Sequence, residues 1–124
     1  MLTHQLDTTS GILSVEPKEP LTEQDFLDVA KEVDAYLANH DNLTGIIISA
    51  AHFPGWENFS GLVEHLRFVR KHQEHINRIA VLTDNPFLQF PPLFVAYFVH
   101  PVIKVFPLKD WGAATLWLRE TAKV

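Results

Sequence analysis

Two short apolar runs constrain the fold of this chain more than any other feature. The run Gly45–Ile48 is rich in isoleucine and shows no alternation of polar and apolar residues, and Ile79–Leu82 is a second apolar run of similar length. Strands of this kind are covered on both faces, as in the middle of a parallel sheet. The sequence therefore predicts an α/β domain with helices packed against a largely parallel sheet.

The other elements alternate around these two strands. An N-terminal hairpin is expected from Leu2–Leu6 and Gly11–Glu16, which flank a Thr-Thr-Ser-Gly turn signal. Thr22 and Asp25 have the spacing of a capping box, which indicates the start of a helix. With the remaining segments, the sequence predicts the order ββαβαβαβα in one domain over residues 1–124. The later helices are expected from Phe59, over Pro91–Val99 and after Asp110, and the last strand over Val102–Phe106.

Composition and charge exclude several classes of function. The net charge is -5 and the Lys and Arg residues are scattered, so the chain has no basic stripe for nucleic acid or for anionic lipid headgroups. The absence of Cys excludes disulfides and thiolate metal sites. Because Met1–Asp7 has neither a basic nor an apolar segment of a signal peptide, we expect a cytoplasmic protein.

Three stretches carry a resemblance to a known family. Gly55–Glu57, Arg78–Asp84 and Trp111–Leu118 are similar to the SpoIIAA-like family of small bacterial proteins, which has the STAS fold of the anti-sigma-factor antagonists. The resemblance spans nearly the whole chain and implies a regulatory module that binds other proteins. Its motifs specify the fold better than an activity.

The resemblance also points to one phosphoacceptor position. In the antagonists a Ser directly before a Gly begins the helix after the central strand, and Ser60-Gly61 lies in a comparable place. The match departs from the family pattern at Asn58-Phe59 and in the longer loop Ala51–Phe59. We interpret Ser60 as a helix cap, with a partner switch controlled at Ser60 as the alternative.

The seven His residues raise the question of a metal site. His72 and His75 are three residues apart and could share an ion, whereas His65 lies two turns earlier. No carboxylate joins them on the helical wheel, so the sequence favours a solvated helix face and no metal or other cofactor.

His52 and Asp84 both follow buried strands and are expected at the carboxyl edge of the sheet, where α/β proteins bind ligands. Either could be an acid, a base or a polar anchor. The sequence supplies neither a nucleophile nor a glycine-rich phosphate loop beside them. We therefore do not expect this protein to be an enzyme. The second alternative is an enzyme of unknown substrate that uses His52 and Asp84.

The segment Phe87–Val99 carries aromatic or aliphatic residues around its whole helical circumference. A helix on one side of a sheet buries only one stripe, and about ten residues cannot span a bilayer. These side chains predict a site for a lipophilic small molecule or reversible association with a membrane surface. A homodimer that covers the same side chains is a further alternative. The expected lining residues are Trp56, Phe87, Phe90, Phe94, Tyr97 and Phe98.

Overall fold

A computed structural model describes residues 2–85 and 101–120 of the chain. Its five strands form one sheet in the order β1-β2-β3-β4-β5. The hairpin β1–β2 is antiparallel and all other neighbours are parallel, as the sequence predicts. The strands are Leu2–Asp7, Ile12–Pro17, Leu43–Ser49, Ile76–Leu82 and Val102–Phe106.

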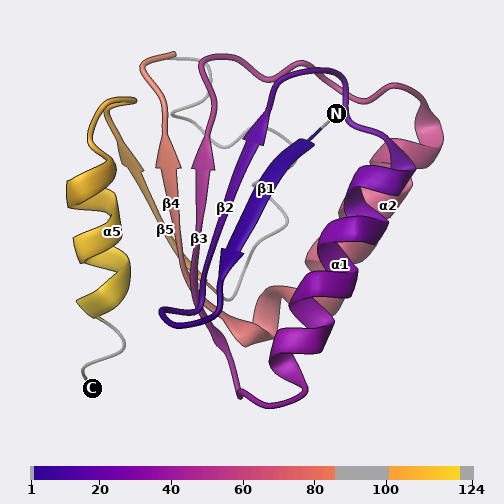
Figure 1. Cartoon of the computed structure of the whole chain (residues 1–124). Helices are drawn as coiled ribbons and strands as arrows, with labels where there is room; N and C mark the ends of the chain where they lie inside the picture. Colours follow the sequence, from indigo (N-terminus) through magenta and orange to yellow (C-terminus); the bar gives the residue numbers. More distant parts are fainter. Residues whose placement is uncertain (1, 86–100, 121–124) are drawn as a thin grey trace.

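The helices lie in two layers on opposite faces of this sheet (Figure 1). Helices α1 (Glu23–Leu37) and α2 (Phe59–His72) pack side by side on one face, and a short 3-10 helix, Gln73–His75, follows α2. Helix α5 (Trp111–Arg119) lies on the other face, over β3 and β4. The helix expected over Pro91–Val99 lies outside the described residues, and the other three expected helices are confirmed.

Strand β3 occupies the middle of the core, as its apolar run predicts. Ile46 and Ile48 face the α1–α2 layer, while Ile47 faces α5. A Cβ atom at Gly45 would lie 2.5 Å from a methyl carbon of Leu118, so the absence of a side chain there lets α5 approach the sheet.

All three described helices begin where the sequence predicts, but the capping side chains agree with the prediction only at α1. The amide of Asp25 donates to the Thr22 hydroxyl over 3.1 Å and the Thr22 amide donates back to the Asp25 carboxylate over 2.9 Å. At α2 the N-cap is Asn58, whose side chain accepts from Gly61, so the prediction of Ser60 as the cap was wrong. Asp110 stands at the N-cap of α5, but its side chain makes no capping hydrogen bond.

The buried face of α2 also differs from the one that hydrophobicity predicts. Hydrophobicity alone places Phe59 inside and Glu64 outside, but Phe59 is 77% exposed and Glu64 is buried, where it pairs with Arg67. The expectation of a solvated face was wrong for His65 and His72, which are buried, whereas His75 is exposed. The reason is that α2 packs on α1 as well as on the sheet, and Gly61 lies against the Leu21 carbonyl, where a Cβ atom would be 2.6 Å from the oxygen.

Candidate functional site

An apolar cavity of about 70 Å³ lies between the sheet and the α1–α2 layer. Strands β2 and β3 line it with Leu13, Val15, Ile46 and Ile48, and the two helices add four side chains. These four are Phe26, Val29, His65 and Phe68. Among the described lining residues, His65 is the only ionisable one, so the cavity offers an occupant almost nothing but hydrocarbon.

The loop that carries Trp56 closes over one end of this cavity. Leu21 and Phe53 both line the cavity, and the Phe53 ring meets the Trp56 ring edge-on at 5.1 Å. The Leu21 amide donates to the Gly55 carbonyl, and the Glu57 amide donates to the Leu21 carbonyl, each over 2.8 Å. The Trp56 loop is therefore fixed to the residues that precede α1.

His65 joins the Trp56 loop to α2 in the wall of the cavity. Its Nδ1 accepts a hydrogen bond from the Trp56 indole N–H over 3.1 Å, and its ring stacks on Phe26 at 4.6 Å. Burial lowers the pKa of His65 to about 4. A charged imidazolium is disfavoured where water is excluded, so this side chain is neutral at physiological pH.

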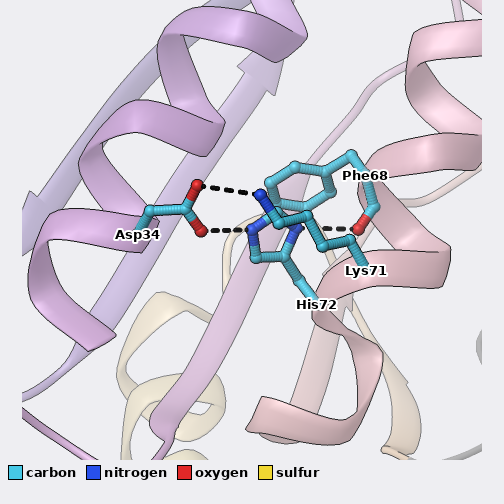
Figure 2. Close-up of polar contacts among 4 residues, drawn as sticks. All are labelled: Asp34, Phe68, Lys71 and His72. Atoms are coloured by element: carbon cyan, nitrogen blue, oxygen red, sulfur yellow. Dashed lines mark hydrogen bonds and ion pairs between the residues drawn. The ribbon is translucent and has the colours of Figure 1, made fainter. Parts of the chain in front are cut away.

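A second polar cluster connects the carboxyl halves of α1 and α2 (Figure 2). His72 is buried, and its Nε2 lies 2.8 Å from Asp34 Oδ1 while its Nδ1 lies 2.9 Å from the Phe68 carbonyl oxygen. Lys71 donates to the other Asp34 oxygen over 3.3 Å. Partial burial by itself raises the pKa of Asp34, but the hydrogen bonds and charges of His72 and Lys71 outweigh it and lower that pKa below its usual value.

This cluster has the features of a structural contact between two helices rather than of a metal centre. Both ring nitrogens of His72 lie within hydrogen-bond distance of protein oxygens, so neither faces a free position for the ion that His72 and His75 were considered to share. Within residues 2–85 and 101–120, no group of three or more His, Asp or Glu side chains could hold a metal ion.

Ser60 lies at the second position of α2, with its side chain exposed. The exposed Phe59 ring precedes it, and Asn58 caps the helix before both. This end of α2 follows directly from the Trp56 loop. A large exposed aromatic and a hydroxyl therefore lie side by side at a helix N-terminus.

The structure places His52 and Asp84 in exposed loops that follow neighbouring parallel strands. Asp84 Oδ1 accepts a hydrogen bond from the Leu108 amide over 3.1 Å, which ties the end of β4 to the loop before α5. Asp84 therefore has a structural role, because its carboxylate stabilises the turn after β4.

The structure describes only one of the six expected lining residues of the lipophilic site. Trp56 is half-buried against Phe53 and His65, beside the apolar cavity. The other five residues lie outside the described part of the chain, and they are Phe87, Phe90, Phe94, Tyr97 and Phe98.

Comparison with known proteins agrees with this architecture. A family model described as SpoIIAA-like matches residues 12–119. The chain belongs to the SpoIIAA-like family. A solved structure from Shewanella loihica PV-4, of a DUF3478-family protein with a SpoIIAA-like fold, is 17% identical with a TM-score of 0.76, over 94% of this chain and 93% of that one. No curated protein matches this chain.

Membership of the SpoIIAA-like family supports a regulatory or interaction module rather than an enzyme. In the part of the chain that the structure describes, no helix is long and apolar enough to cross a membrane.

Proposed function

We propose that this SpoIIAA-like domain is a non-catalytic binding module that takes an apolar group of a lipophilic small molecule into the cavity between the sheet and the α1–α2 layer. The observation that carries the proposal is the cavity itself, which is about 70 Å³ in volume and whose described lining is hydrocarbon apart from one neutral imidazole. Interiors rarely leave such space empty, because each unfilled contact costs dispersion energy.

The size and chemistry of the cavity define the part of a ligand that it takes. An apolar cavity of about 150 Å³ stays dry and binds benzene or xenon, so the present one suits a slimmer group such as the end of an alkyl chain. Each methylene that leaves water contributes about 0.8 kcal/mol. The wall offers no Lys or Arg among the described residues, so affinity comes from apolar contact rather than from charge.

Xenon is the probe that tests the cavity directly. Under xenon pressure, methyl resonances of Val29, Ile46 and Ile48 should shift in carbon-detected methyl spectra, while those of the exposed Leu116 should not. The change Val29→Leu adds one methylene to the cavity wall and should weaken the shifts. Leu27→Ala changes an exposed residue of the same helix and is the matched control. Unshifted cavity methyls would overturn the proposal.

The source of the apolar group is tested on the freshly purified protein. Native mass spectrometry followed by organic extraction identifies a copurifying lipophile, and flotation with neutral and anionic liposomes tests a membrane surface. The sequence-based hypothesis assigns membrane association to Phe94 and Phe98, so changing both to Ser should abolish flotation. A bare protein that also ignores both kinds of liposome would contradict the lipophilic function and favour a protein partner.

The α2 N-terminus supports a second candidate function, a protein-interaction switch at Ser60. The supporting observation is that Ser60 and Phe59 are exposed together at the start of the helix, with Phe59 77% exposed. A phosphate on Ser60 would lie near the positive end of the helix dipole. An aromatic anchor beside a group that can gain charge suits reversible contact with a protein.

Mass spectrometry of protein isolated from its own cells tests this second candidate. A phosphorylated peptide that contains Ser60, absent from the Ser60→Ala variant, would support the switch. Ser49 is buried and serves as the internal control, because a kinase cannot reach it in the folded protein. Protein that carries no phosphate at Ser60 under any growth condition would leave the cavity as the functional site.

A further inference from the structure

The face of the sheet opposite the apolar cavity contains a groove with a different chemistry. Helix α5 packs over β3 and β4, and none of the described helices lies over β1 and β2 on this face (Figure 1). The groove between α5 and this uncovered part of the sheet has a volume of about 240 Å³. Ile12 and Ile47 contribute apolar surface to its lining.

The walls of the groove combine one aromatic ring with neutral polar groups. Trp111, Thr115 and Arg119 line it from α5 at intervals of four residues, so they lie on one side of the helix. Gln5 and Ser14 line it from the two strands opposite. Trp111 is 42% exposed, although burial of its indole would be favourable.

The charges that line the groove are balanced. Asp7 and Arg119 both belong to the lining, and they have opposite signs. Hydrogen bonds from the Thr9 and Ser10 amides hold the pKa of Asp7 below its usual value, and the charge of Arg119 acts in the same direction. Asp7 is therefore ionised, and among the described residues the groove lining has no surplus cation for a phosphate or a carboxylate.

We propose that this groove binds a neutral saccharide, independently of the lipophilic function. The apolar face of one sugar ring would lie on the Trp111 indole, and its hydroxyls would exchange hydrogen bonds with Gln5, Ser14 and Thr115. These side chains both donate and accept, as ring hydroxyls do. A groove of about 240 Å³ is smaller than the sites of drug-sized ligands, which begin at roughly 300 Å³, and so suits a single ring.

A nucleotide fits this groove less well. Its base could also stack on Trp111, but its phosphate would need a cation, and Arg119 is balanced by Asp7. The protein as a whole carries a net charge of -5, which further disfavours an anionic ligand.

Saturation-transfer difference NMR on the full chain tests the proposal with glucose, galactose, mannose and N-acetylglucosamine. At least one sugar should give a signal, and the amide resonances of Gln5, Ser14 and Thr115 should shift on its addition. Trp111→Ala should weaken binding by about tenfold or more, as loss of a central aromatic contact does. Leu116→Ala is the control, because Leu116 is exposed on the same helix but does not line the groove.

Three results would overturn the saccharide site. These are the absence of a signal with all four sugars, a signal that survives Trp111→Ala, and shifts confined to residues outside the groove. Adenosine is added as a competitor, and a signal from adenosine alone would assign the groove to nucleosides instead. Because the groove and the apolar cavity lie on opposite faces of the sheet, xenon binding and sugar binding succeed or fail separately.

Discussion

The indole N–H of Trp56 donates a hydrogen bond to Nδ1 of His65 over 3.1 Å. This bond joins the loop after β3 to the middle of α2, and His65 is only 7% exposed. It also defines the proton positions of the ring, because an accepting Nδ1 carries no hydrogen. A neutral hydrogen bond between two aromatic side chains thus adds to the backbone bonds that hold the Trp56 loop beside the apolar cavity.

We expect Trp56→Phe to lower the free energy of unfolding by about 1–3 kcal/mol, the cost of leaving a buried acceptor unsatisfied. Urea unfolding measures this change. Trp111→Phe is the matched control, because Trp111 is exposed at the start of α5, and its effect should stay within about 0.5 kcal/mol. Equal losses in the two variants would mean that the bond to His65 contributes little.

The low pKa of His65 predicts a loss of stability in mild acid. In the unfolded chain this side chain takes up a proton near pH 6.5, whereas in the folded protein burial delays protonation to about pH 4. Between these values the unfolded state holds more protons, so stability falls as the pH is lowered from 6.5 to 4. One pKa unit corresponds to about 1.4 kcal/mol, so the loss should approach about 3 kcal/mol.

His65→Gln isolates this contribution, since an amide oxygen can still accept from Trp56 but does not titrate. The variant should lose less stability than the natural protein when unfolding is followed from pH 7 to pH 4. If the two proteins lose stability in parallel, another group is responsible for the acid sensitivity.

Much of the fold could be predicted from local patterns. The run Gly45–Ile48 placed β3 in the centre of the sheet, and Thr22 with Asp25 marked the first turn of α1. The buried face of α2 could not be predicted in this way. Hydrophobicity favoured Phe59 as an inward residue, but the approach of Gly61 to Leu21 and the packing on α1 turn Glu64 and His65 inward instead.

Of the six residues expected to line a lipophilic site, Trp56 alone lies in the described part of the chain, where it contacts Phe53 and His65 beside the cavity. The cavity wall comes from β2, β3, α1 and α2 together, so no single segment signals it. Gly61 followed four residues later by His65 is the nearest signal, because a small residue in a helix indicates close packing and places His65 on the same face. The groove beside α5 has one sequence signal, the four-residue spacing of Trp111, Thr115 and Arg119, which places these side chains on one side of a helix.

The Asp34 carboxylate should stabilise the contact between α1 and α2. Asp34→Asn should lower the free energy of unfolding at pH 7 by about 1 kcal/mol, a modest value because the Asp34 side chain is 45% exposed. Since the pKa of Asp34 is lowered in the folded protein, its contribution is present above the unfolded value of 3.8 and is lost as the pH falls through the folded value. The difference between the two proteins should therefore shrink at pH 3.

Asp28→Asn is the control for this comparison. Asp28 is exposed on the same helix and accepts a hydrogen bond from Gln24 within one helical turn. Its replacement should change stability by no more than about 0.5 kcal/mol. A loss at Asp34 that stays the same from pH 7 to pH 3 would contradict the ionic role of its carboxylate.

Two helical glycines should respond to the same substitution with opposite signs. Gly61→Ala would place a Cβ atom 2.6 Å from the Leu21 carbonyl oxygen, which is backbone and cannot yield easily, so we expect a loss of about 1–3 kcal/mol. At Gly112 a Cβ atom meets nothing within 4 Å. Gly112→Ala should therefore stabilise the protein by about 0.5–1 kcal/mol through the better helix propensity of alanine. Thermal unfolding of both variants tests this prediction. A gain in stability for Gly61→Ala would show that α2 does not pack closely against Leu21.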